Sequence, residues 1–105
     1  MNTIKTLRQA GYKIRINHYR YLENQTDLVP MYEIRKNGWQ QFITPKGGKT
    51  IMQVTTATGY DYQVVAGCKQ CDSFNRKVAV LICLGRLGKL EQKNAEILLA
   101  TKPNV

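Results

Sequence analysis

The sequence predicts an α+β fold, an antiparallel sheet of four or five strands packed against a long C-terminal helix, with a short helix at the N-terminus. Three observations predict it. Residues 12–22 alternate between apolar and polar side chains, the period of a half-buried strand. Residues 50–56 and 60–66 have strand composition, and the intervening Ala57-Thr58-Gly59 predicts the turn of a hairpin. Residues 78–84, VAVLICL, are apolar without a break and favour a buried helix.

The long helix is expected over about 72–90, with an extension towards 100 if Gly88 does not end it. Asp72 is the expected N-cap, because its carboxylate can accept hydrogen bonds from the free N–H groups of the first turn. Apolar or small residues then fall on three faces: Phe74, Val78, Leu81, Gly85 and Gly88; Val80, Leu84 and Leu87; and the narrower pair Ala79 and Cys83. A helix that is apolar all round is buried all round. We therefore expect a homo-oligomer, at least a dimer, with the subunit contact on the narrow face of small side chains.

The remaining segments are short and are interpreted by their turn signals, within one domain of residues 1–105 whose sheet spans about 12–67. Asn37-Gly38 is the strongest hairpin signal in the chain. The expected order is helix 4–10 ended by Gly11, strand 12–22, polar loop 23–30, strand 31–36, return strand 39–44, turn 45–49 and the 50–66 hairpin.

The charge of the chain favours an anionic partner. Lys and Arg total 16 against 7 for Asp and Glu, a net charge of +9 on 105 residues. A nucleic acid, a nucleotide or an acidic protein surface would each suit that charge. No apolar signal segment and no stretch of membrane-spanning length is present, and three cysteines do not form a disulfide framework. We expect a cytoplasmic protein without a membrane partner.

Catalytic and metal-binding patterns are weak. Cys68 and Cys71 have the C-x-x-C spacing of half a zinc site, but a second pair of ligands is missing, so no metal and no cofactor are expected. His18, the single histidine, falls on the apolar face of its strand, where a structural role is favoured. Carboxylates are scarce and none pairs at a spacing suited to acid–base chemistry. We expect the protein not to be an enzyme.

A motif at the start of the long helix resembles a known group of proteins. Small phage-encoded proteins often end in a strand followed by C-x-x-x-D-x-F-[DN], a small residue and an arginine. The residues that match in register are Cys68, Asp72, Phe74, Asn75, Ala79, Ile82, Cys83, Arg86 and Leu87. This stretch is similar to the phage Thoeris anti-defence sponges. Departures from the pattern include Ala79 where Gly is usual and Arg76 in place of a frequent aromatic.

The resemblance implies a non-enzymatic sponge, acting in the cytoplasm of an infected bacterial host. Such proteins sequester a cyclic nucleotide or a cyclic ADP-ribose-type immune signal and so counteract antiviral defence. The candidate ligand-binding residues are Arg86, Asn75, Arg76, Lys69 and Phe74 from the helix region, with Arg15, Tyr19 and Tyr60 from the sheet. Two alternatives stay open: a basic nucleic-acid-binding phage protein, for which Lys13, Arg15, Arg35, Lys46 and Lys49 could supply a face, and a protein inhibitor of a host defence nuclease.

Two arginines of the helix are central to this expectation. Arg76 in the first turn opposes the helix dipole unless an anion binds there or the side chain simply points into water. Arg86 is expected on the narrow face of small residues, where a buried guanidinium needs a phosphate or several acceptors. A salt bridge or a backbone carbonyl would satisfy Arg86 equally well.

Overall fold

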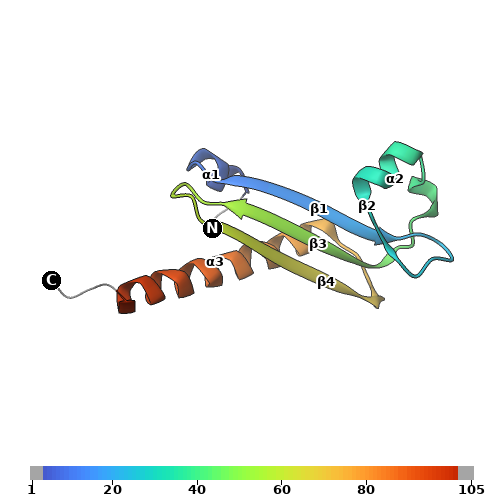
Figure 1. Cartoon of the computed structure of the whole chain (residues 1–105). Coiled ribbons are helices and arrows are strands. Elements are labelled where there is room, and N and C mark those ends of the chain that lie inside the picture. The colour runs from blue at the N-terminus through green and yellow to red at the C-terminus, as the bar shows by residue number, and fades with distance from the viewer. Residues whose placement is uncertain (1–3, 102–105) are drawn as a thin grey trace.

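The computed structural model describes residues 4–101, with side chains described up to residue 96. Its elements confirm the α+β prediction: one four-stranded antiparallel sheet, order β2-β1-β3-β4, beside a long C-terminal helix and a short N-terminal one (Figure 1). The elements in chain order are α1 (Ile4–Gln9), β1 (Lys13–Tyr21), β2 (Leu28–Pro30), α2 (Met31–Asn37), the 3-10 helix η1 (Gln40–Phe42), β3 (Lys46–Thr55), β4 (Asp61–Ser73) and α3 (Arg76–Thr101).

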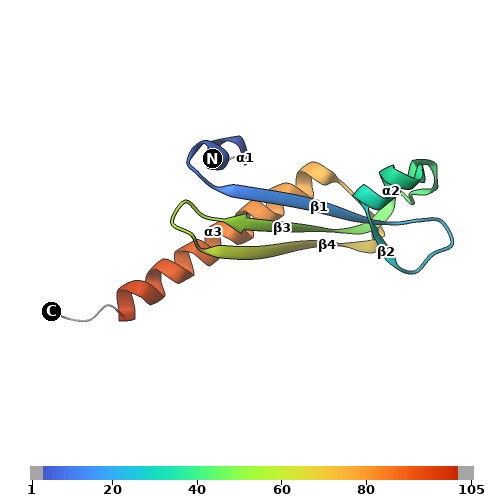
Figure 2. The same cartoon turned by 45° about the horizontal axis from the view of Figure 1, so that its top comes forward.

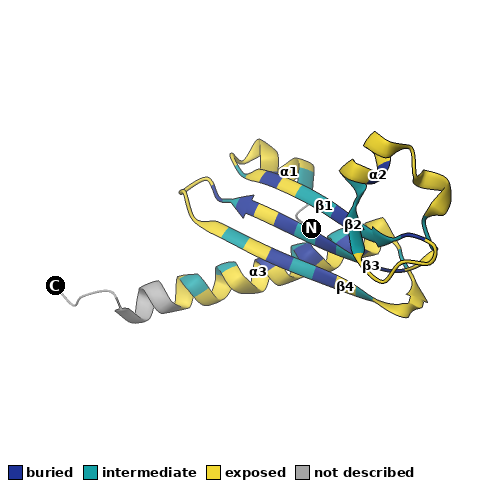
Figure 3. Cartoon of the chain, turned by 45° about the vertical axis from the view of Figure 1, so that its right-hand side comes forward, coloured by how far each residue is buried: buried dark blue, intermediate teal, exposed yellow. Residues whose placement is uncertain are grey.

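Alternation along the strands separates a core face from an open face of the sheet. In β3, Thr50, Met52 and Val54 are buried, whereas Gln53 between them is exposed. Pairing of Met52 with Ile16 and Val64 carries the same face across β1 and β4. Blue and teal bands therefore alternate with yellow ones along the strands in Figure 3. The predicted direction of side chains in residues 12–22 is confirmed.

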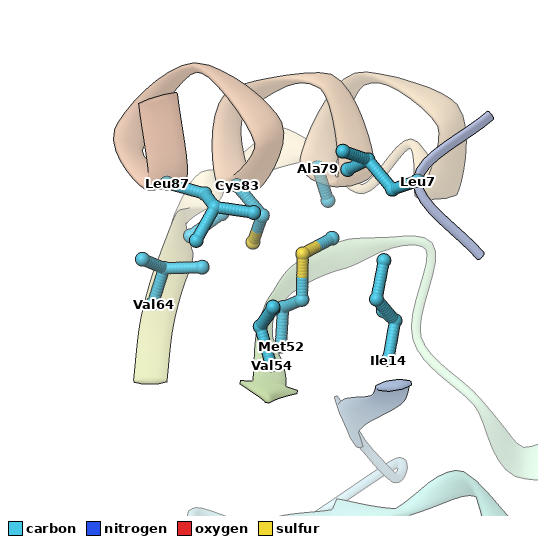
Figure 4. Packing of buried hydrophobic residues seen from close by; sticks show 9 residues of the cluster. Leu7, Ile14, Met52, Val54, Val64, Ala79, Cys83 and Leu87 are labelled. Carbon is cyan, nitrogen blue, oxygen red and sulfur yellow. The ribbon is translucent and has the colours of Figure 1, made fainter. Parts of the chain in front are cut away.

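Helix α3 covers the core face and runs behind the sheet on one side (Figures 1 and 2). Its inward residues, Ala79, Cys83 and Leu87, are spaced four apart and at most 7% exposed. Figure 4 shows them above Met52 and Val64, with Leu7 of α1 beside Ala79. The face of small side chains is thus filled by the chain's own sheet, and the subunit contact expected there is wrong. Small residues at 79 and 83 let the helix approach the sheet closely.

The N-terminal half departs from prediction at Asn37-Gly38, because this dipeptide is typical both of a hairpin turn and of a helix end. Met31–Asn37 is a helix, and Gly38 ends it in the left-handed conformation at φ 69°. Asn-Gly favours a hairpin turn, but a glycine just past a helix is also the commonest helix stop. The return strand predicted over 39–44 is instead the 3-10 helix η1, and the loop predicted over 23–30 ends in the short strand β2.

Two boundaries near the long helix also differ from prediction. The turn predicted over 45–49 is the first half of β3, and the strand that ends near residue 67 in the prediction continues as β4 to Ser73. Helix α3 consequently begins at Arg76 rather than at Asp72 and continues past Gly88 to Thr101.

Candidate anion-binding site

The start of α3 is set by Asn75, not by Asp72. The Oδ1 atom of Asn75 accepts a hydrogen bond from the backbone N–H of Val78 at 3.1 Å, which is the interaction of an N-cap residue. No acidic residue stands in the first turn. Because Arg76 is the first residue of this 26-residue helix, its charge lies where the helix dipole favours an anion.

Phe74 anchors this end of the helix to the sheet. Its ring lies edge-on to His18, with ring centroids 5.8 Å apart and an interplanar angle of 81°. The guanidinium carbon of Arg20 lies 4.3 Å from the ring centroid, a cation–π arrangement. Arg20 also donates to the carbonyl oxygen of Thr44 at 2.9 Å. The aromatic of the sequence motif is therefore a packing residue between two basic side chains of β1.

A pocket of about 260 Å³ opens where β1, α2 and the start of α3 meet. It brings together three nitrogen-bearing side chains from three elements, His18, Arg35 and Arg76. The full lining is Ile16, Asn17, His18, Met31, Tyr32, Arg35 and Arg76, with no carboxylate among them. We call this cavity the basic pocket.

The charged side chains that line the basic pocket are all cations. His18 is 9% exposed, and its Nδ1 atom lies 2.7 Å from Thr50 Oγ1 in a hydrogen bond. Burial lowers the pKa of His18, and the cations Arg76, Arg20 and Arg35 lower it further. The charged groups that lower the His18 pKa are all positive, and two of them, Arg35 and Arg76, line the pocket, so they would stabilise an anion there.

Of the eight predicted ligand residues, the structure brings four close to this end of α3: Phe74, Asn75, Arg76 and Lys69. Lys69 lines a neighbouring depression of about 280 Å³ together with Phe74 and Asn75, but not the basic pocket itself. The other four lie elsewhere. Arg15 and Tyr19 belong to the open face of the sheet, and Tyr60 is an exposed residue of the β3–β4 turn.

Arg86 is not buried, contrary to the expectation for its helix face. It is exposed and donates from Nη1 to the backbone carbonyl of Val65 in β4. A carbonyl was one of the alternatives to a bound phosphate, and it is the partner present here. A role of Arg86 in ligand binding stays a prediction.

Sequence reasoning did not select His18 as a ligand residue, and it placed Arg35 on a nucleic-acid-binding face and not in a pocket with Arg76. Alternation correctly assigned His18 to the core face, but gave no sign that three arginines surround it. Arg35 was assigned to a strand, and only its place in helix α2 turns it towards β1. Such a meeting of distant segments has no local sequence signal.

The three cysteines differ in burial and in their contacts. The Cys68 thiol lies 3.4 Å from the carbonyl oxygen of Asp72, Cys71 is exposed, and Cys83 is buried. Burial raises the pKa of the Cys83 thiol. Within the described residues, no three His, Cys, Asp or Glu side chains gather as a set of metal ligands.

Within residues 4–101, no helix is both long enough and apolar enough to cross a membrane. Comparison of the chain with protein-family models, curated proteins and solved structures found no match.

Proposed function

We propose that this protein is a non-catalytic binder of a small phosphate-bearing anion and that the basic pocket is its site. The observation that carries the proposal is the convergence of His18, Arg35 and Arg76 on one cavity whose lining contains no carboxylate. The two guanidinium charges, held beside a neutral imidazole without a counter-charge, repel one another. A bound anion removes that cost.

The chemistry of the pocket suits a phosphate group. Guanidinium groups bind phosphate oxygens through paired N–H donors. The first turn of α3 adds backbone N–H groups and the positive end of the helix dipole. A pocket of about 260 Å³ holds a phosphate and part of an attached nucleoside. Tyr32 lines the pocket and is 60% exposed, so its ring can stack on a base at the rim.

The sequence resemblance extends this proposal to a biological role. A cyclic nucleotide or a cyclic ADP-ribose-type signal carries the phosphate and the base that the pocket would recognise. Sequestering such a signal needs binding without cleavage. Nδ1 of His18 is already engaged by Thr50, and the pocket offers no carboxylate as a partner base. We propose a sponge encoded by a phage that protects it from host immune signalling.

The test is a titration of the purified protein with cyclic AMP, a cyclic dinucleotide, cyclic ADP-ribose and inorganic phosphate. Arg76→Ala and Arg35→Ala should each weaken binding at least tenfold, about 1.4 kcal/mol. Lys77→Ala is the matched control, an exposed cation in the same helical turn that does not line the basic pocket. Heating the complex should release the ligand intact.

Equal loss in all three variants would mean that general charge, not the basic pocket, attracts the ligand. A cleaved product after heating would overturn the non-catalytic part of the proposal.

A second candidate function is nucleic-acid binding, favoured by the open face of the sheet. Lys13, Arg15 and Lys49 project from this face, and Lys49 pairs directly with Tyr19 across β1 and β3. A single strand could stack on the tyrosine and place its phosphates on the cations. Binding of a short oligonucleotide should then fall steeply with salt. It should weaken in Arg15→Ala and stay unchanged in Arg76→Ala, the reverse of the small-anion pattern.

A further inference from the structure

The outward surface of α3 is apolar although no element of the described chain covers it. Val78 is 49% and Leu81 57% exposed, and Gly85 and Gly88 continue the same row. At 100° per residue these four fall within an arc of about 80°, opposite Cys83. We call them the outer stripe. A helix face that stays in water normally carries charged residues, and between residues 78 and 88 this one carries none.

Packing within the subunit does not require glycine at either position of the outer stripe. A Cβ added at Gly85 or at Gly88 would meet no atom within 4 Å. Glycine inside a helix costs about 1 kcal/mol relative to alanine. A surface that packs against the helix backbone from outside would offset that cost, because it can approach glycine more closely than any other residue.

The outer stripe has a projecting side chain, Leu81, next to an apolar groove. Leu81 projects, and beside it an apolar groove of about 430 Å³ is lined by Leu7, Leu81, Leu84, Gly85, Leu87, Gly88 and Glu91. A surface with adjacent, mutually complementary features is what a two-fold symmetric contact requires. We infer that the occupant is a second copy of this chain, with the two α3 helices antiparallel and crossing near Gly85.

Antiparallel packing fits the order of large and small residues. A crossing near Gly85 places Leu81 of each copy within one position of the level of Gly88 in the other, so each leucine can fill the space above a glycine. A parallel pair would instead set Leu81 against Leu81 and glycine against glycine, which leaves a void. Well-packed interfaces do not contain such voids.

The length of α3 is an independent observation in favour of this contact. Its C-terminal turns run past the end of the sheet in both views (Figures 1 and 2). Helical segments gain most of their stability from packing on other elements. In the antiparallel dimer, with residue 78 opposite residue 92, the first projecting turn of one copy lies against the first turn of α3 in the other.

Sedimentation velocity at micromolar concentration tests the dimer. The wild-type chain should sediment as a dimer, and Leu81→Glu should weaken association at least a hundredfold. Phe42→Glu is the matched control, since Phe42 is 44% exposed on η1, far from the outer stripe in sequence. A monomeric wild-type protein, or a Leu81→Glu protein that stays dimeric, would overturn the inference.

The variant Gly85→Leu tests whether association depends on close helix–helix packing at Gly85 or only on exposed apolar surface. Leucine favours the helix and adds apolar surface, so the variant should keep its helical circular dichroism. It should nevertheless dissociate at least tenfold more readily, because the added side chain holds the helices apart. Unchanged or tighter association would show that the glycines do not mark the contact.

Cysteine cross-linking tests the antiparallel direction, in a background in which Cys68 and Cys71 are serine. Residues 78 and 92 are both seven positions from Gly85, so Val78→Cys mixed with Gln92→Cys should form a disulfide-linked heterodimer. A parallel pair would give Val78→Cys homodimers instead. That result would overturn the antiparallel arrangement.

Discussion

The ring of Phe74 lies so close above the backbone of Gly48 that a Cβ at residue 48 would stand 2.6 Å from Phe74 Cδ2. The contact joins the first half of β3 to the start of α3. It explains why a glycine interrupts a strand at this point, since a strand glycine often marks a close approach of other atoms. The glycine and the aromatic, twenty-six positions apart, are one packing unit.

Gly48→Ala should therefore destabilise the protein by about 3 kcal/mol, because the new methyl group meets the ring and the carbonyl oxygen of Tyr19. Gly67→Ala is the control, in the neighbouring strand, where a Cβ meets nothing within 4 Å. Urea unfolding of both variants measures the difference. Similar midpoints for the two would contradict the packing described for Phe74.

Acid should destabilise the protein through His18. Burial and the facing cations Arg20, Arg35 and Arg76 lower its pKa in the folded state, so below the ordinary value of 6.5 the unfolded chain takes up the proton first. Stability should be full above that pH and fall as the pH drops through the folded pKa. Thermal melts from pH 7.5 to pH 5 measure the slope.

His18→Asn is the control variant for that slope, since asparagine can keep a hydrogen bond to Thr50 but does not titrate. Its melting temperature should depend less on pH than that of the wild type.

An anion in the basic pocket should also raise the pKa of His18. Binding of a cyclic nucleotide, whose phosphodiester does not titrate in this range, should then strengthen on acidification, and buffers of different ionisation enthalpy should reveal proton uptake.

Tyr12 ties the start of β1 to α3. Its hydroxyl donates to Glu91 Oε2 at 2.8 Å, and this bond raises the pKa of Tyr12. Tyr12→Phe should lower the free energy of unfolding by about 1 kcal/mol. Tyr60→Phe, on an exposed tyrosine of the β3–β4 turn, should change it little. An equal effect of both variants in urea unfolding would argue against a stabilising bond to Glu91.

The three cysteines should differ in reactivity. Cys71 is exposed and Cys68 is half-buried, whereas burial raises the pKa of the Cys83 thiol and removes it from solvent. A thiol reagent should modify two cysteines in the native protein and the third only after unfolding. Rapid modification of all three would contradict the placement of Cys83 between α3 and the sheet.

Prediction from the sequence succeeded where a pattern is local. The alternation of Tyr12 to Leu22 and the turn at Gly59 depend on neighbours in the chain, and β1 and the β3–β4 hairpin follow them. It failed at Asn37-Gly38, because a hairpin and a helix end use the same dipeptide. Because the hairpin was preferred, residues 31–36 were predicted as a strand and helix α2 was not predicted.

The candidate site was predicted less well than the fold. Arg76 and Asn75 were selected from their position near a helix start, and both lie there. Arg35 and His18 could not be assigned to one site with Arg76, since their nearness to Arg76 depends on how α2 packs on β1. For Arg86, rotation about the helix axis suggested burial, but a side chain beside an outer strand reaches past the core to a carbonyl.

That carbonyl belongs to the outermost long strand of the sheet, and the hydrogen bond from Arg86 to Val65 has a consequence for aggregation. Unpaired strand edges are templates on which further strands can add, and proteins protect them with charged side chains. Arg86 occupies the carbonyl of Val65, the fifth residue of the thirteen-residue β4. The opposite edge, β2, is only three residues long. Addition of a further strand is thereby hindered at Val65 and at the short strand β2.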